Sequence, residues 1–209
     1  MRKEERQHVK IPFNINEAKA LATVLNHYKE NHYWIVLMGL TLLYVFLQTF
    51  MIPGAILLTL IYGFLFPAWV ALPVVCLACA TGASGCYMLS LLVGRRIIRA
   101  NFPERIQQWT EKVEEQRDNL LNFIIFLRIT PILPNWFINI ASPIIGVPLS
   151  IFWLGTFIGV APPSLLVIQA GSTLNAMTSS SASSSYTSLI ILAIIALVSL
   201  IPVFYRSRH

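Results

Sequence analysis

Two long stretches without charge constrain this chain more than any other feature. Residues 34–93 contain no Asp, Glu, Lys or Arg, and residues 123–205 contain a single charged residue, Arg128. A helix that crosses the roughly 30 Å hydrocarbon core of a bilayer needs about 20 apolar residues, so each stretch is long enough to cross more than once. Charged residues make up only 11% of the chain, whereas a soluble protein has about 25%. The sequence therefore predicts an all-α polytopic membrane protein.

The remaining charges lie in three segments that flank these stretches. Residues 1–33 hold six Lys or Arg and four Asp or Glu, residues 94–122 hold six and five, and residues 206–209 hold two arginines. Because Lys and Arg are in excess on the cytosolic side of membrane proteins, we expect all three segments to be cytosolic. Residues 34–205 then form one membrane domain, which includes the cytosolic amphipathic loop 94–122. No basic stripe interleaved with aromatic residues is present, so the net charge of +6 does not indicate nucleic-acid binding.

The segment before the first charge-free stretch is amphipathic. Asn14 or Asn16 can cap a short helix through a side-chain oxygen. Leu21, Leu25 and Tyr28 then fall on one face at helical spacing. We expect this helix to lie along the bilayer or along the rest of the protein.

Helix-breaking residues divide the first charge-free stretch. Two spans use about 40–45 of its residues, which leaves too few for a third crossing. Near its middle, Pro53 removes a backbone donor and Gly54 relaxes the backbone. We therefore predict a span over 34–50, a re-entrant hairpin over 51–66 and a returning span over 69–93.

Prolines divide the second stretch in a similar way. Its first part contains too many prolines for one straight helix, namely Pro131, Pro134, Pro143 and Pro148. We predict a second re-entrant hairpin there, followed by spans over about 149–172 and 188–204 with an uncharged Ser-rich loop over 178–188. With this even number of spans, both termini lie in the cytosol and the hairpins enter from opposite faces. The predicted fold is thus two inverted re-entrant hairpins packed with about four transmembrane helices.

Arg128 is the most informative residue for function. A charge at membrane depth costs several kcal/mol on insertion scales, so it usually faces a cavity or a partner. The alternative is an arginine that snorkels from just inside the interface. The planar guanidinium fork suits phosphate oxygens, and a broken helix adds free backbone groups. The candidate lipid-path residues of this hairpin are Arg128, Thr130, Pro131, Pro134, Asn135 and Asn139, with Ser142 nearby.

The first hairpin supplies weaker candidates. Gln48, Pro53 and Gly54 lie at its predicted tip, with Thr49 and Thr59 close in sequence. For the polar members of this set, ordinary hydrogen bonding between helices is at least as good an explanation.

The sequence offers no catalytic centre at membrane depth. Gly82-Ala83-Ser84-Gly85 resembles the GxSG motif of intramembrane serine proteases, but such a serine needs a base, and all four histidines lie outside the charge-free stretches. Cys76 and Cys79 form a CxxC motif without any acid or histidine at the same depth. No P-loop motif is present either. We therefore expect no enzyme activity, no metal and no cofactor, and we interpret Gly82–Gly85 as a helix-packing motif together with Ala78 and Cys86.

Three segments carry a resemblance to a known family. They are FLQTFMIPGAILLTLIYGFLFP, FLRITPILPNWFINIASPIIGVP and GTFIGVAPPSLLVIQAGSTL. These segments resemble the DedA/VTT family, also called SNARE-associated Golgi proteins, and most closely its eukaryotic transmembrane protein 41 branch. The resemblance covers about Val9 to Tyr205 and implies two oppositely inserted re-entrant hairpins. It also implies phospholipid scrambling in the endoplasmic reticulum membrane, with roles in autophagosome formation and lipid mobilisation. By position, Pro53-Gly54 match the tip of the first hairpin, and the second hairpin's motif is matched by Arg128, Pro131, Pro134 and Asn135.

The chain departs from the family pattern at a few positions. Members of this branch usually carry a further hydrophobic segment before the region that begins here, which implies a shorter form or part of a longer chain. Bacterial relatives often place an acid after the Pro-Gly pair, where this chain has Ala55, and a second Arg where it has Asn135. Without a carboxylate at membrane depth, proton-coupled transport is disfavoured.

Three hypotheses follow for the function. The first is an energy-independent phospholipid scramblase whose ligands are membrane phospholipids. The second is a secondary transporter of a small anion or lipid-like solute, and the third is a membrane scaffold that recruits autophagy or lipid-transfer proteins through residues 1–33 and 94–122. The sequence leaves open which lipids move and the oligomeric state.

Overall fold

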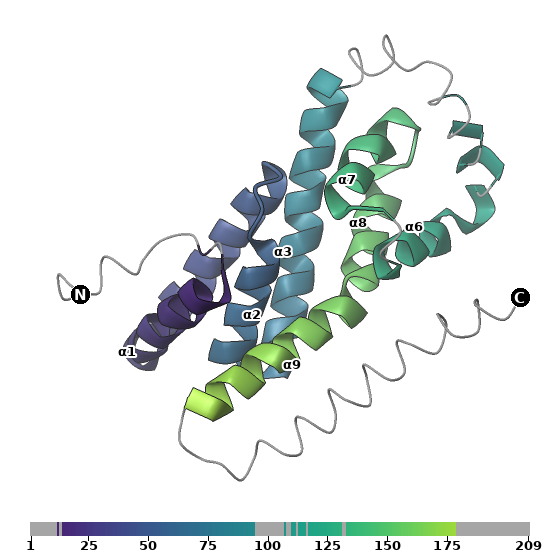
Figure 1. Cartoon of the computed structure of the whole chain (residues 1–209). Helices are drawn as coiled ribbons and strands as arrows, with labels where there is room; N and C mark the ends of the chain where they lie inside the picture. Colours follow the sequence, from purple (N-terminus) through teal and green to yellow (C-terminus); the bar gives the residue numbers. More distant parts are fainter. Residues whose placement is uncertain are drawn as a thin grey trace, which may run out of the picture.

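The computed structural model describes residues 12, 14–94, 107, 110–111, 113–115, 117–130 and 133–178. Every regular element among these residues is helical (Figure 1). Three helical stretches are long and apolar enough to cross a membrane: Ile15–Thr49, Ala68–Val93 and Leu149–Ala176. These helices support the predicted all-α integral membrane protein. Much of the N-terminal segment, residues 95–106 of the amphipathic loop, most of the Ser-rich loop, the predicted span 188–204 and the tail 206–209 lie outside the described residues.

Helix α1 (Ile15–Thr49) begins where the sequence predicts a cap. The Asn14 Oδ1 atom accepts a hydrogen bond from the backbone N–H of Glu17 at 2.8 Å, which satisfies one free donor of the first turn. His32 has non-helical dihedrals (φ −138°, ψ 49°) and divides α1 into two limbs (Figure 1). The first limb buries Ala18, Leu21 and Ala22 in the protein core. The amphipathic N-terminal helix therefore packs on the protein.

The second limb of α1 and helix α2 (Ala55–Leu65) run antiparallel. Met51 (φ 58°) and Gly54 (φ 137°) reverse the chain between them. Thr41 and Tyr62 share a hydrogen bond of 2.8 Å, and further along Lys29 donates to the Leu65 carbonyl oxygen at 2.5 Å. The chain break predicted at Pro53-Gly54 is confirmed.

Helix α3 (Ala68–Leu89) runs parallel to the second limb of α1 and continues as a π-helix to Gly94. The ring centroids of Tyr33 and Phe66 lie 5.3 Å apart just before α3 begins, whereas Gly85, much further along α3, meets Thr49. Between residues 33 and 94 the chain therefore runs along the bundle three times, through the second limb of α1, α2 and α3. Two spans were predicted for this stretch.

This geometry corrects the prediction that 51–66 doubles back on itself. Residues 55–65 form one unbroken helix. The range also contains Gly63, which lies at a helix crossing and not at a turn. In an all-apolar stretch, the pattern cannot distinguish these two uses of glycine.

Small residues let α1 and α3 approach closely. A Cβ atom on Gly82 would lie 2.6 Å from the Gln48 Cβ, and one on Gly85 would lie 2.6 Å from the Thr49 Oγ1. The Thr49 hydroxyl also donates to the Gly82 carbonyl oxygen at 3.2 Å. The interpretation of Gly82–Gly85 as a packing motif is confirmed.

From Arg117 on, the described chain forms a short 3₁₀ helix (Arg117–Asn119) and then four α-helices. They are α6 (Leu120–Ile129), α7 (Asn135–Ile144), α8 (Leu149–Gly159) and α9 (Ala161–Thr178). The predicted span 149–172 is bent at Val160, where α8 ends and α9 turns away (Figure 1). Pro162 and Pro163 fall in the first turn of α9, where a missing N–H costs no helical hydrogen bond.

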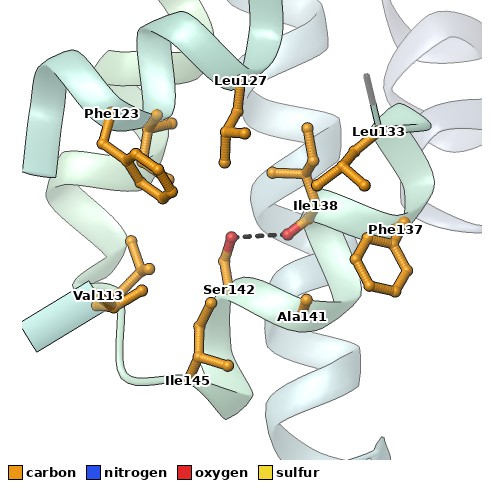
Figure 2. A pocket seen from close by; sticks show the side chains of 11 residues that line it. Val113, Phe123, Leu127, Leu133, Phe137, Ile138, Ala141, Ser142 and Ile145 are labelled. Carbon is orange, nitrogen blue, oxygen red and sulfur yellow. Dashed lines mark hydrogen bonds between the residues drawn. The ribbon is translucent and has the colours of Figure 1, made fainter. Parts of the chain in front are cut away.

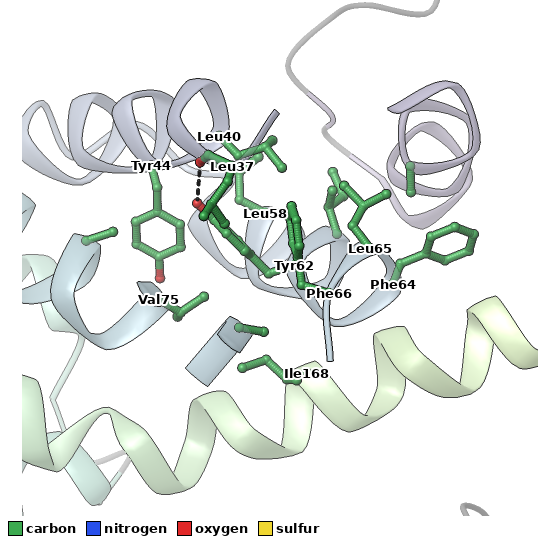
Figure 3. Packing of buried hydrophobic residues seen from close by; sticks show 14 of the residues in the cluster. Leu37, Leu40, Tyr44, Leu58, Tyr62, Phe64, Leu65, Phe66, Val75 and Ile168 are labelled. Carbon is green, nitrogen blue, oxygen red and sulfur yellow. Dashed lines mark hydrogen bonds between the residues drawn. The ribbon is translucent and has the colours of Figure 1, made fainter. Parts of the chain in front are cut away.

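The main core lies between α1, α2, α3 and α9 (Figure 3). At the crossing of α2 and α9, a Cβ atom on Gly63 would lie 2.0 Å from the Ile168 carbonyl oxygen, and one on Gly171 would lie 2.1 Å from the Leu60 carbonyl oxygen. The two backbones therefore touch directly. Around this crossing pack the buried side chains of Leu37, Leu40, Tyr44, Leu58, Tyr62 and Val75 (Figure 3).

Candidate functional site

Arg128 lies in the last turn of α6 and is buried, with only 4% of its surface exposed. Its Nη1 donates to the Asn135 Oδ1 at 3.2 Å, and its Nη2 donates to the Asn139 Oδ1 at 2.7 Å. The guanidinium carbon lies 5.1 Å from the centroid of the Phe152 ring, within the range of a cation–π contact. Residues from α6, α7 and α8 therefore hold the guanidinium together.

Close packing of α6 on α8 explains this burial. A Cβ atom on Gly159 would lie 2.6 Å from the Arg128 Cβ, and one on Gly155 would lie 2.7 Å from the Ile124 Cγ2. The absence of side chains on these glycines brings the base of Arg128 against the α8 backbone. Arg128 therefore does not snorkel outward, and it lies inside the helix packing.

No carboxylate pairs with Arg128 among the residues that the structure describes. The ion pair seen in this part of the chain joins Arg117 and Glu114 at 3.1 Å in the amphipathic segment. Amide oxygens and an aromatic ring thus surround the full positive charge of Arg128. In a low-dielectric interior, such a charge attracts an anion.

A cavity of about 410 Å³ adjoins the guanidinium. It lies where α6 ends and α7 begins. The predicted residues Arg128, Thr130, Pro134 and Asn135 line it, together with Leu133 and Pro163. Pro131, which was also predicted, lies outside the described residues.

An apolar pocket of about 240 Å³ lies between α6 and α7 (Figure 2). Ser142 is the polar side chain in its lining, and its hydroxyl donates to the Ile138 carbonyl oxygen at 2.6 Å. Leu133 lines both this pocket and the cavity beside Arg128. The cavity that contains these polar groups and the apolar pocket thus share Leu133 as part of their walls. The other apolar lining residues include Phe123, Leu127, Phe137, Ala141 and Ile145 (Figure 2).

The first-hairpin candidates do not line this cavity. Gln48 packs against Gly82 on the other side of α3, and Pro53-Gly54 form the reversal between α1 and α2. Thr59 is buried and lies 3.3 Å from the Tyr44 hydroxyl, so it links α2 to α1. Hydrogen bonding between helices therefore explains Thr59.

Sequence reasoning missed the contribution of α8. Phe152, Thr156 and Gly159 lie at spacings of four and three residues, which places them on one helix face, and both Phe152 and Gly159 contact Arg128. The spacing is visible in the sequence. However, α8 is apolar apart from Ser150 and Thr156, which is too little to distinguish the face that meets a charge from the face that meets lipid.

A buried arginine that has no carboxylate partner within the described part of the chain, held where one short helix ends and the next begins, defines a membrane protein with a polar site inside its helix bundle. The VTT domain family matches residues 52–173, which include this site. The chain belongs to this family, as the resemblance predicted.

The similar proteins place it further, in the transmembrane protein 41 branch. It is 58% identical over 177 residues to the transmembrane protein 41 homolog of Drosophila melanogaster, covering 85% of this chain and 55% of that protein. It is 54% identical to the Caenorhabditis elegans homolog, covering 72% of that protein, and 52% identical to human transmembrane protein 41B, covering 61%. The chain thus spans little more than half the length of some of its relatives. No solved structure matches it significantly.

Proposed function

We propose that this protein is an energy-independent phospholipid scramblase, and that lipid headgroups pass Arg128. The observation that carries the proposal is a guanidinium with 4% exposure beside a cavity of about 410 Å³. An uncompensated charge at membrane depth is costly. A passing phosphate would offset this cost, because charge-assisted bonds between arginine and phosphate are among the strongest hydrogen bonds in proteins.

The paired cavities favour a lipid over a small anion. The cavity beside Arg128 presents polar groups, whereas the adjoining pocket of about 240 Å³ is almost wholly apolar. A phospholipid carries the same two chemistries, a phosphate joined to acyl chains. A small inorganic anion would occupy the polar cavity alone.

The hairpin arrangement is part of the proposal. We take the second limb of α1 with α2 as the first re-entrant hairpin, and α6 with α7 as the second. The proximity of Tyr33 to Phe66 supports this assignment, because both ends of the first hairpin then emerge on one side. Since α3 crosses from that side, its C-terminal end lies at the opposite face, and the basic residues that follow it in the sequence favour the cytosol for that face.

This arrangement revises the predicted side of α1. Its first limb now lies on the side away from the cytosol. Two exposed positions, Glu17 and Glu111, are used to test this placement. Single substitutions E17C and E111C should react with an impermeant maleimide from opposite sides of sealed vesicles. The native cysteines Cys76, Cys79 and Cys86 are buried, and labelling of the unchanged protein gives the background signal that they produce. Labelling of both positions from one side would contradict the arrangement.

The family resemblance supports placing this activity in the endoplasmic reticulum membrane. Membrane phospholipids are its proposed ligands. Lipid supply for autophagosome formation and lipid mobilisation is the proposed role, with autophagy or lipid-transfer proteins as partners.

Lipid movement can be measured directly in vesicles. Purified protein is reconstituted into liposomes with a fluorescent phosphatidylcholine, and dithionite is added from outside. We expect the probe of both leaflets to be quenched for the unchanged protein, and only the outer-leaflet probe for R128M. The control R117M changes an exposed arginine of the amphipathic segment and should keep full activity. Quenching by the unchanged protein at the level of protein-free vesicles would refute the proposal.

An ionophore separates this function from a coupled transporter. The charge-free stretches contain no carboxylate, so no proton-binding acid is available at membrane depth. Collapse of proton and sodium gradients should therefore leave the rate unchanged. A rate that falls with the gradient would favour the transporter.

A further inference from the structure

Two buried polar atoms next to the candidate site have no hydrogen-bond partner among the residues that the structure describes. They are the Nε of Arg128 and the Oγ1 of Thr156. Thr156 has 0% exposure and Arg128 has 4%. Buried polar groups in folded proteins are almost always hydrogen-bonded, so both atoms require a partner.

The side chain of Arg128 extends along α8 past Thr156. Its Cβ lies against Gly159, and its guanidinium carbon lies 5.1 Å from the Phe152 ring centroid. Thr156 lies between these two contact points and on the same helix face. The Nε atom likewise lies between Cβ and the guanidinium carbon along the arginine side chain. The Arg128 Nε and the Thr156 Oγ1 therefore lie at about the same height along α8, in the interface between α6 and α8.

We propose that Thr156 is a positioning residue for Arg128. Its Oγ1 accepts the Nε–H of Arg128 through one bound water, because the two atoms make no direct hydrogen bond with each other. The guanidinium is then fixed at three nitrogens, with Asn135 on Nη1 and Asn139 on Nη2, and its face rests on Phe152.

This anchor determines which donors remain for a ligand. A guanidinium carries five N–H groups, and the three anchors occupy one on each nitrogen. One N–H therefore remains on Nη1 and one on Nη2, and these two donors suit two oxygens of one phosphate. The step from anchoring to phosphate binding rests on the proposed function, whereas the contact with Thr156 does not.

The contact is tested by nuclear magnetic resonance on the full chain in nanodiscs. Arginine Nε–H signals are recorded with ¹⁵N-labelled arginine, and the Arg128 signal is identified by its loss in R128K. In T156V, which keeps the shape and removes the acceptor, we expect this signal to shift. In T156S it should stay near its original position. The control T173V removes another buried threonine hydroxyl, which bonds within α9, and should leave the signal unchanged.

A lipid-scrambling assay on the same variants tests the consequence. We expect T156V to slow scrambling about tenfold, the effect of losing one hydrogen bond to a charged group, and T156S to restore the rate. An Arg128 signal that is the same in T156V and in the unchanged protein would overturn the inference, whatever the rate. If the signal shifts but the unchanged protein does not scramble, the positioning role of Thr156 stands and the proposed function fails. T156A provides a second test of the signal should T156V fold poorly.

Discussion

Replacement of Asn139 by leucine tests how the charge of Arg128 is stabilised. Asn139 has 1% exposure, and its side-chain oxygen accepts from the Arg128 Nη2 at 2.7 Å. Leucine is close to asparagine in size but accepts no hydrogen bond. Its main effect is therefore to leave one N–H of a buried cation without a partner.

The magnitude follows from this geometry. A hydrogen bond to a charged group contributes about 1.5–3 kcal/mol, and an unpaired buried group costs a similar amount. We expect N139L to lower the free energy of unfolding by about 2–3 kcal/mol. N135L should cost less, about 1 kcal/mol, because the Asn135 bond is longer, at 3.2 Å, and its side chain is exposed.

Unfolding by sodium dodecyl sulfate in mixed micelles measures these differences. The control S142A changes a buried residue of the same helix. The Ser142 hydroxyl donates to the Ile138 carbonyl oxygen within that helix. A double-mutant cycle with R128M isolates the interaction, since N139L should be nearly neutral once the cation is gone. The reasoning is refuted if N139L costs no more than S142A, or if its cost is unchanged in the R128M background.

Two further predictions concern the packing of α2. G63A should lower the free energy of unfolding by about 1–3 kcal/mol, because the new Cβ would lie 2.0 Å from the Ile168 carbonyl oxygen. The control is G39A, where nothing lies within 4 Å of the new Cβ. It should be neutral or slightly stabilising in the same detergent titration. K29M should destabilise the protein by about 1 kcal/mol, because Lys29 donates to the Leu65 carbonyl oxygen at the C-terminus of α2. A K29R variant that retains the stability of the unchanged protein would support this hydrogen bond as the cause.

The sequence predicted the parts of the site that differ chemically from their surroundings. Arg128, Asn135 and Asn139 stand out in an apolar stretch, and the structure joins them by hydrogen bonds. The same reasoning found the break at Pro53-Gly54, because proline and glycine have known effects on the backbone.

Features that depend on which apolar surfaces meet could not be predicted in this way. The direction of α2 is determined by packing against α1 and α9, and its sequence is apolar apart from Thr59 and Tyr62. Phe152 and Gly159 serve Arg128 only because α8 lies against α6. A single sequence without polar faces contains little information on such pairings.

The crossing of α2 and α9 limits how this protein can move. At Gly63 and Gly171 the two backbones touch, so one helix cannot slide past the other without first separating from it. Because α2 belongs to the first half of the chain and α9 to the second, the crossing holds the two halves together as a fixed frame. A rocking-bundle cycle would have to break and remake this contact in every turnover. Opening confined to α6 and α7 would leave it intact, and a crosslink across α2 and α9 should then not slow the lipid movement that we propose.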